Sequence, residues 1–338
     1  MRRLGDFDIL NLLEIKGLST QFNSNGRVIP AVDGIDIYVK SEETVGIVGE
    51  SGSGKTVTAL SIMRLLPRTG AKITRGEILF KGRNLIDLTD EEMRDVRGNQ
   101  IAMIFQEPMT SLNPVYTIGQ QLNEMMILHR GYTKKQAKEC AIEMLKKVHI
   151  PRAEKIYDEY PHQLSGGMRQ RVMIAMAMSC NPELLIADEP TTALDVTIQA
   201  QILDLMRELG KIQKTSILLI THDLGVVSEM CDRVFVMYAG QVVEEADVCT
   251  LFENSSHPYT QGLFKSIPRA DNIGRLDSIP GNVPLPGTIK EGCRFASRCS
   301  HTLPKCLKDD PPLFQIAGGH KTRCWLHADG GLEEGVNR

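Results

Sequence analysis

The sequence reads Gly49-Glu50-Ser51-Gly52-Ser53-Gly54-Lys55-Thr56 between two apolar segments. This octapeptide fits the pattern G-x-x-x-x-G-K-[ST], which describes a loop whose backbone N–H groups surround phosphate. Glycines let the backbone curl inward, the lysine supplies a cation for the β- and γ-phosphates, and the threonine supplies a hydroxyl for Mg²⁺. A glycine-rich turn that binds nothing is the alternative, and the Lys55-Thr56 ending argues against it. The sequence therefore predicts that the chain binds a nucleotide.

The segments on either side of the octapeptide support this prediction. Residues 44–48 are typical of a buried strand that enters the loop, and residues 57–66 are typical of a helix that leaves it. The N-terminus of such a helix attracts phosphate because its first N–H groups are unpaired and its dipole is positive there. A strand, a loop and a helix in this order are the setting that a phosphate-binding loop requires.

Composition and charge limit the classes of protein to consider. The 338 residues suffice for about two domains, and 42% apolar and 24% charged residues are typical of a globular protein. The net charge of −3 argues against a general nucleic-acid binder, which usually carries a basic surface. The longest apolar run, 172–178, is far shorter than the roughly 18 residues of a membrane span. Because Asp6, Asp8 and Glu14 interrupt any signal-peptide core, we expect a cytosolic chain with reduced thiols.

Hydrophobic patterns predict an α/β protein. Residues 10–43 alternate apolar and polar side chains, which predicts strands paired across a turn at 23–26. Residues 107–164 carry apolar side chains at helical spacing instead, which predicts a helical insertion. Short apolar runs at 184–187 and 216–220 end in polar side chains, as expected where an α/β sheet binds a ligand along one edge.

A second glycine-containing segment, Leu164 to Arg171, precedes another helical pattern. Ser165 can cap that helix, and the two glycines after it leave room for a phosphate at the positive end of the helix. With this segment in place, the chain resembles the ABC-type ATPases. The features of that family occur in the family's order: the P-loop at 49–56, Gln106 of the Q-loop, the signature at 164–170, Asp188-Glu189 of Walker B, Ala193-Leu194-Asp195 of the D-loop and His222 of the switch.

The resemblance implies a mechanism in which two such domains pair head to tail. ATP on the P-loop of one domain is covered by the signature of the other. Glu189 is the implied general base, His222 contacts the γ-phosphate, and Gln106 reaches Mg²⁺ or the attacking water. The implied Mg²⁺ ligands are Thr56, Gln106 and Asp188. The implied ATP-binding residues are Phe22, which stacks on adenine, with Gly49, Glu50, Ser51, Gly52, Ser53, Gly54, Lys55, Thr56 and Thr58. Those that cover the partner's ATP are Leu164, Ser165, Gly166, Gly167 and Met168, with Asp195 in the D-loop.

A closer resemblance is to the ATP-binding subunits of oligopeptide/dipeptide importers, whose relatives also carry nickel and other solutes. It rests on residues 49–55, 105–114, 257–263 and 279–299. It implies an ATPase, converting ATP and water to ADP and phosphate, that powers peptide uptake from the cytoplasmic face of the membrane as a peripheral protein. The implied partners are two membrane permeases, whose contact lies near residues 106–115, a second ABC ATPase subunit, and indirectly an extracytoplasmic binding protein. In the family the second ATPase is commonly a related but distinct chain, and a second copy of this chain is the alternative.

Three other functions remain as alternatives. The chain could serve a nickel or other small-solute importer with few visible changes. A soluble ABC ATPase acting on nucleic acid or the ribosome usually carries a coiled-coil insertion or two ATPase domains, and neither is present in this sequence, so we expect no nucleic-acid partner. A regulatory module with a vestigial ATPase is disfavoured because Lys55, Asp188, Glu189 and His222 are all present.

The C-terminal part of the sequence differs in composition. Prolines accompany four cysteines, Cys293, Cys299, Cys306 and Cys324, spaced C-x5-C-x6-C-x17-C. Four thiolates in a tail with little core suggest a metal site. A 4Fe–4S cluster is the preferred interpretation, with zinc or no metal as alternatives, because zinc sites more often show a C-x2-C pair. The other four cysteines are predicted to be buried thiols, and His301, His320 and His327 solvated loop side chains.

The predicted fold class is thus α/β: a P-loop ABC ATPase core with an antiparallel β subdomain and a helical insertion, plus a small loop-rich cysteine tail. We expect the ATPase domain to span residues 1–265, with the helical subdomain at about 107–164, and the tail to span residues 266–338.

Overall fold

The computed structural model describes residues 11–24, 26–106, 111–192, 194–266, 279–289 and 291–328. They divide into two compact units, each of which is described by itself. The helical unit comprises Met1–Glu14, Tyr38–Thr44 and Ile78–Leu219, and the P-loop unit comprises Ile15–Ile37, Val45–Glu77 and Ile220–Arg338. None of the helices in the described ranges combines the length and apolar character needed to cross a membrane.

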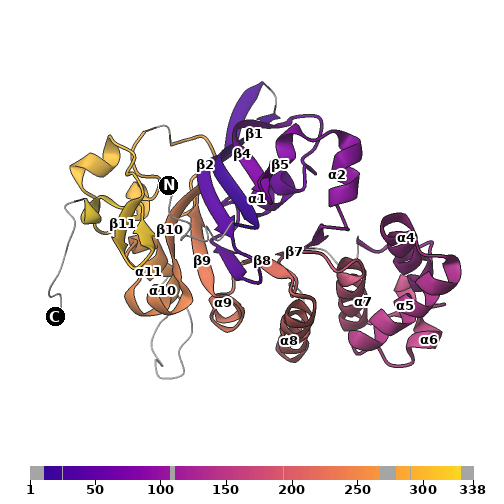
Figure 1. The fold of residues 1–338 in the computed structure, drawn as a ribbon. Helices are drawn as coiled ribbons and strands as arrows, with labels where there is room; N and C mark the ends of the chain where they lie inside the picture. Colours follow the sequence, from indigo (N-terminus) through magenta and orange to yellow (C-terminus); the bar gives the residue numbers. More distant parts are fainter. Residues whose placement is uncertain are drawn as a thin grey trace, which may run out of the picture. The chain divides into compact units, whose positions relative to one another are not determined.

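The P-loop unit is built on strands (Figure 1). Its elements, some of which begin or end in the other unit, are β1 (Leu13–Ser24), β2 (Arg27–Val39), β3 (Thr44–Val48), α1 (Lys55–Ile62), β4 (Ala71–Phe80), α9 (Leu224–Met230), β9 (Arg233–Tyr238), β10 (Gln241–Asp247), α10 (Val248–Asn254), α11 (Pro258–Lys265), β11 (Phe314–Ala317) and β12 (His320–Thr322). Strand β1 lies between β2 and β4 in one sheet, and the order in the other is β11-β12-β10-β9-β3. Strands β3 and β9 are parallel, whereas β9, β10, β12 and β11 pair antiparallel.

The strand and helix around the P-loop form as the sequence predicts, with one difference. Strand β3 is buried along almost its whole length, as expected for a central strand. Helix α1 ends at Ile62, whereas the sequence pattern extended it to residue 66. The chain leaves the helix because Arg64 adopts φ 49°, a left-handed conformation that an α-helix does not accommodate.

Within the described residues, the helical unit contains the larger share of the helices together with several strands. Its elements are β5 (Arg83–Asn84), α2 (Asp90–Val96), β6 (Ile101–Ile104), α4 (Ile118–Arg130), α5 (Lys134–Lys147), α6 (Ala153–Ile156), α7 (Gly166–Met178), β7 (Leu184–Asp188), α8 (Val196–Gln213) and most of β8 (Ser216–Thr221). The strand order is β8-β7-β6, and β6 and β7 are parallel. Helices α4 and α5 pack on each other and on α7.

Capping residues define the helices of the insertion. Thr117 and Thr133 each form a capping box, with Gln120 and Gln136 three residues later. Both helices turn an apolar face inward, as the sequence spacing requires: α4 buries Ile118, Leu122 and Met126, and α5 buries Ala137, Ala141, Met144 and Leu145. The described part of 107–164 therefore agrees with the predicted helical insertion, and residues 107–110 lie outside the described residues.

The C-terminal tail joins the sheet of the P-loop unit. Strand β12 pairs with β10, with Glu244 opposite Thr322 and Glu245 opposite Lys321. Phe295, which is 3% exposed, packs in the same apolar cluster as Val48 at the end of β3. The sequence did not predict either contact, because only the loop-rich composition of the tail was visible. The predicted boundary at 265/266 adjoins residues 267–278, which lie outside the described residues, and stays a prediction.

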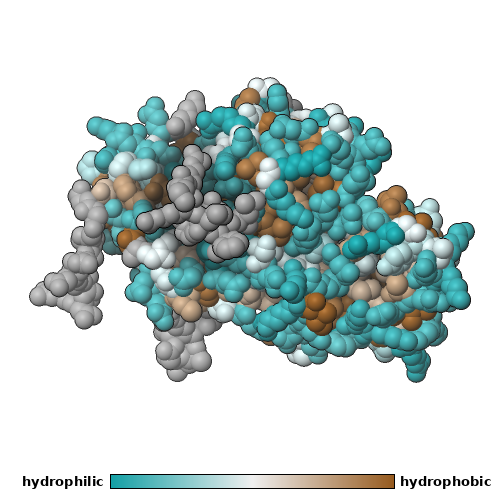
Figure 2. Space-filling view, in the orientation of Figure 1, coloured by the Kyte–Doolittle hydropathy of each residue, from teal (hydrophilic) through white to brown (hydrophobic). Residues whose placement is uncertain are grey.

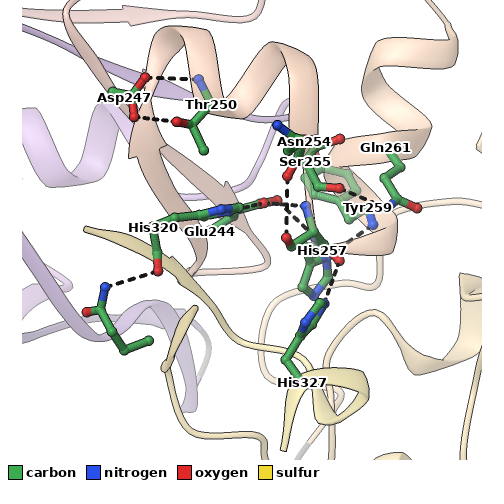
Figure 3. A network of polar contacts seen from close by, with 12 residues as sticks. Glu244, Asp247, Thr250, Asn254, Ser255, His257, Tyr259, Gln261, His320 and His327 are labelled. Carbon is green, nitrogen blue, oxygen red and sulfur yellow. Dashed lines mark hydrogen bonds and ion pairs between the residues drawn. The ribbon is translucent and has the colours of Figure 1, made fainter. Parts of the chain in front are cut away.

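A buried carboxylate anchors this pairing (Figure 3). Glu244 is fully buried and accepts hydrogen bonds from the backbone N–H groups of Ser256 (2.6 Å) and His257 (3.0 Å), while His320 Nε2 lies 2.8 Å from it. His320 is only 5% exposed, so the prediction that it is a solvated loop residue was wrong. The reason is that a buried carboxylate requires partners, and the tail strand supplies one.

Candidate ATP site

The P-loop adopts a backbone that only glycine accommodates at two positions. Gly49 has φ 154°, and an added Cβ would lie 2.1 Å from the Met237 carbonyl oxygen. Gly54 has φ 104°, and its Cβ would lie 2.6 Å from the Ala31 carbonyl oxygen. Since both neighbours are backbone atoms, neither can move aside cheaply. The P-loop therefore packs against β2 and β9, and their carbonyl groups leave no space for a side chain at Gly49 or Gly54.

The lysine of the loop is held inside it. Lys55 is 6% exposed, and its Nζ donates to the carbonyl oxygens of Gly49 (2.7 Å) and Glu50 (3.0 Å). Thr56 is half-buried in the first turn of α1. Thr58 is buried and its hydroxyl donates to the Gly54 carbonyl at 3.0 Å, which fastens α1 to the loop. The ammonium group of Lys55 is therefore buried within the loop, where the loop backbone surrounds it.

Phe22 lies on β1 in the same unit. Its half-buried ring lines a pocket of about 290 Å³ together with residues of β1, β2 and β4, including Val28 and Lys72. A partly open aromatic face beside a pocket can stack on a planar heterocycle. This pocket is consistent with a contact between Phe22 and adenine, which stays a prediction.

The predicted base and Q-loop glutamine meet in the helical unit. Gln106 Nε2 donates to Glu189 Oε2 at 3.0 Å, and the Thr192 hydroxyl donates to the same oxygen at 2.9 Å. Asp188 ends β7 and is 2% exposed. Glu189 has φ 46°, a left-handed conformation that costs energy for a residue with a side chain. Strain of this kind at the end of a buried strand is typical of a functional residue whose side chain must point in one direction.

The other predicted residues occupy the ends of helices. Ser165 is the N-cap of α7 and accepts from the Met168 N–H at 3.3 Å, so the signature lies at the positive end of that helix. Asp195 is the N-cap of α8 and accepts from the Ile198 N–H at 3.0 Å. His222 follows β8 and is exposed. Ala193 of the predicted D-loop lies outside the described residues.

The two sets of predicted residues belong to different units. The P-loop unit holds Phe22, the residues of 49–58 and His222, whereas the helical unit holds Gln106, the signature, Asp188, Glu189 and Asp195. The structure brings Gln106 and Glu189 into contact within one unit, whereas the sequence predicted only that Gln106 reaches Mg²⁺ or the attacking water. Sequence patterns gave no signal for Thr192, whose hydroxyl contacts Glu189.

The tail cysteines are near one another without forming a metal site. Burial is the main cause that raises the pKa of Cys293 to about 12, and the neighbouring Cys306, Cys324 and Cys299 contribute to the same increase. Burial likewise raises the pKa of Cys324 to about 11. Yet across the described ranges, no group of three or more His, Cys, Asp or Glu side chains is arranged to hold a metal ion. This geometry does not support the predicted 4Fe–4S or zinc site.

The remaining cysteines are only partly as predicted. All eight cysteines are free thiols, and Cys180 is buried. Burial raises the pKa of Cys231 to about 12. Cys249 is exposed near the start of α10, so the prediction that it is buried was wrong, because its position falls on the outer face of that short helix.

Comparison with known proteins identifies the family. Residues 32–192 match the family described as ABC transporter, and residues 243–306 match the family described as oligopeptide/dipeptide transporter, C-terminal region. The chain is 55% identical to the oligopeptide transport ATP-binding protein AppD of Bacillus subtilis (strain 168), over 96% of this chain and 99% of that protein. It is 49% identical to the oligopeptide transport ATP-binding protein OppD of the same organism, over 95% of this chain and 90% of that protein.

A solved structure agrees in fold. The dimeric bacterial ABC transporter cassette MJ0796 is 29% identical, with a TM-score of 0.63 over 70% of this chain and 98% of that one. The α/β prediction of an ABC ATPase core is therefore confirmed, whereas a separate cysteine tail domain is not. This protein is an ATPase that belongs to the ABC transporter ATP-binding proteins of the oligopeptide/dipeptide transport family.

Proposed function

We propose that this chain hydrolyses ATP to power the uptake of dipeptides and oligopeptides through a membrane permease complex. The observation that carries the proposal is the similarity to oligopeptide transport ATP-binding proteins over 96% of the chain, including their characteristic C-terminal region. We further propose that residues 1–265 form the ATPase domain and that residues 266–338 form a tail dedicated to this class of transporter.

Hydrolysis depends on positioning and charge, since phosphoryl transfer needs little covalent chemistry from the protein. Lys55 binds the β- and γ-phosphates, and the loop glycines present backbone N–H groups to them. Glu189 accepts a proton from the attacking water, and the Gln106 amide that contacts its carboxylate orients that water. His222 contacts the γ-phosphate. The signature at the N-terminus of α7 binds the ATP of a partner subunit.

The oxygen donors suit magnesium. The Thr56 hydroxyl and the Asp188 carboxylate are hard ligands of the kind that Mg²⁺ prefers, with Gln106 as a third. Asp188 is 2% exposed at the end of β7, where a buried carboxylate is best stabilised by a cation. Bound with ATP, Mg²⁺ neutralises phosphate charge.

Exposed apolar side chains of the helical unit support contact with a permease. Val115 is 70% exposed, Tyr116 49% and Leu128 71%, all within or next to the insertion that the Q-loop leads into. Figure 2 shows hydrophobic surface over the part of the molecule where Figure 1 labels α4. Exposed apolar surface on this unit is the support for a contact with a partner there. The proposed partners are two permeases, a second ABC ATPase subunit and, indirectly, an extracytoplasmic binding protein, which places the chain at the cytoplasmic face of the membrane.

The tail cysteines form a separate part of the proposal. We infer that Cys293, Cys299, Cys306 and Cys324 bind a 4Fe–4S cluster, with zinc as the alternative. The support is the sequence spacing C-x5-C-x6-C-x17-C of these cysteines in a tail with little core. The thiols as placed do not form a metal-binding group, so binding requires that their side chains turn toward one another and lose their protons.

Uptake measurements test the transport function. Cells that lack this gene are complemented with the wild-type chain, and the accumulation of a labelled tripeptide is compared with that of Ni²⁺. The proposal predicts that complementation restores peptide accumulation and leaves Ni²⁺ accumulation unchanged. Restoration of Ni²⁺ accumulation alone would assign the chain to a nickel importer, and restoration of neither would overturn the proposed function.

A further inference from the structure

An ion pair connects the tail to the P-loop. Arg298 lies in the tail between Cys293 and Cys306, and its Nη1 and Nη2 contact Glu50 Oε2 at 2.8 Å and Oε1 at 3.2 Å. Glu50 is the second residue of the phosphate-binding octapeptide. Two parallel contacts between a guanidinium and a carboxylate fix direction as well as distance. The Glu50 side chain is 29% exposed and that of Arg298 is 5% exposed, so the pair is largely shielded from water.

Arg298 is itself held firmly. Its Nε donates to the Pro280 carbonyl at 2.9 Å, and its Nη1 donates to the Tyr238 hydroxyl at 3.3 Å. The guanidinium lies 5.8 Å from the ring centre of Tyr238 and 5.9 Å from that of Phe295. With these contacts the arginine loses little further freedom when it binds the carboxylate.

A tyrosine restrains the backbone of the same P-loop residue. The Glu50 N–H donates to the Tyr259 hydroxyl at 2.8 Å. Tyr259 is fully buried, with its ring centre 4.6 Å from that of Tyr238 and 5.4 Å from that of Phe295. The side chain and the backbone of Glu50 are therefore both fixed by one aromatic cluster, to which the tail contributes Phe295.

We infer that Arg298 is a positioning residue for ATP binding, which holds the Glu50 carboxylate and neutralises its charge beside the phosphate site. The inference rests on the proposed function, because it assumes that ATP binds at the P-loop. An unpaired carboxylate within the octapeptide would repel the phosphates of ATP, and the affinity for ATP would fall. The cysteine-rich tail is thus part of the nucleotide site rather than an appendage to it.

The experiment compares variants of the full chain by their Kd for ATP without Mg²⁺ and by kcat and KM in the assembled transporter. Arg298→Ala is expected to raise Kd and KM by about tenfold, equivalent to about 1.4 kcal/mol, with a smaller change in kcat. Arg298→Lys, which keeps the charge without the two-pronged contact, is expected to lie between Arg298→Ala and the wild type.

Two further measurements separate charge neutralisation from simple loss of structure. The double variant Arg298→Ala/Glu50→Gln is expected to recover most of the lost affinity, since it removes the repelling charge. Raising the salt concentration is expected to reduce the penalty of Arg298→Ala, because added ions screen that charge. Arg323→Ala is the matched control: Arg323 also fastens the tail, through the Val242 and Pro311 carbonyls, but does not touch the P-loop.

The outcomes are distinct. The inference is overturned if Arg298→Ala binds ATP as the wild type does, if Glu50→Gln fails to restore affinity in the double variant, or if Arg323→Ala loses as much affinity as Arg298→Ala. Failure of the proposed function has different signatures: a wild-type chain that binds no ATP would refute the ATPase, and a wild-type chain that binds ATP but restores no peptide accumulation would refute only the transported solute.

Discussion

Single residues carry the nucleotide chemistry, and Lys55 shows how. Its ammonium group is buried in the curl of its own loop, where it donates to two backbone carbonyls. Phosphate oxygens are stronger acceptors than these carbonyls because they are charged. ATP therefore offers the lysine better partners in the position it already occupies.

Lys55→Ala should lower the affinity for ATP by about tenfold to a hundredfold, because it removes one or two charge-assisted hydrogen bonds to phosphate. Titration of the full chain with ATP measures this, and a thermal melt of the same sample shows whether the loop survives the loss of its internal donor. Lys147→Ala, which removes an exposed lysine paired with Glu143, is the matched control. Equal ATP affinity in wild type and Lys55→Ala would contradict the assignment of the P-loop.

A residue pattern predicted the phosphate-binding loop because its chemistry requires particular side chains at fixed spacing, whereas the family resemblance implied the Walker B acids. The family resemblance placed Gln106 near Mg²⁺ or the attacking water, and its hydrogen bond to Glu189 is a finding of the structure. The contact between Arg298 and Glu50 could not be predicted in this way. The two residues are 248 positions apart, and an arginine beside a cysteine has no spacing that points to a distant loop.

Among the elements, strand β10 connects the tail to the rest of the P-loop unit, because it pairs with β12. Glu244 on this strand binds His320 of β12 and the N–H groups before α11, while Glu245 binds Arg233 and Lys321. The sequence shows Glu244 and Glu245 only as two adjacent acidic residues. It could not show that two buried carboxylates on β10 select the tail hairpin, because burial is decided by packing across the sheet.

Acid should weaken this region through His257. Burial lowers the pKa of His257 from its ordinary 6.5 to about 4, despite the nearby charge of Glu244. The unfolded chain therefore binds a proton at higher pH than the folded chain, and the free energy of unfolding falls as the pH drops from about 6.5 toward 4. The slope is at most about 1.4 kcal/mol per pH unit for one such group.

Urea unfolding at a series of pH values measures this slope. Replacement of His257 with Gln, which cannot titrate, should flatten the decline between these pH values. His162→Gln serves as control, because His162 is exposed on the helical unit. Parallel pH profiles for wild type and His257→Gln would rule out His257 as the source of acid sensitivity.

The tail cysteines make a prediction of their own. Protein purified without oxygen should contain about four iron and four sulfide per chain and show a broad band near 400 nm, roughly as a 4Fe–4S cluster does. Cys293→Ser should lose the metal, whereas Cys249→Ser, which removes an exposed thiol outside the tail, should keep it. One zinc per chain and no colour would favour the alternative metal. Absence of both metals from the wild-type chain would refute the metal proposal.

At the scale of the whole molecule, the residues predicted to act on ATP belong to two units. The P-loop unit contains the residues proposed to bind phosphate, and the helical unit contains the proposed base, the Q-loop glutamine and the signature. The proposed base and the Q-loop glutamine thus belong to the same unit as the exposed apolar side chains that are proposed to contact a permease. This arrangement suits a protein that converts nucleotide hydrolysis into movement of a membrane partner.

The central claim is that the chain hydrolyses ATP with Glu189 as the base. The most direct test measures ATP affinity and ATP hydrolysis on one preparation of the assembled transporter, with wild-type chain, Glu189→Gln and the control Glu183→Gln, which alters an exposed partner of Lys81. The account predicts that Glu189→Gln binds ATP as the wild type does and hydrolyses it at least about a hundredfold more slowly, as loss of a general base requires. Hydrolysis at the wild-type rate in Glu189→Gln would contradict the account.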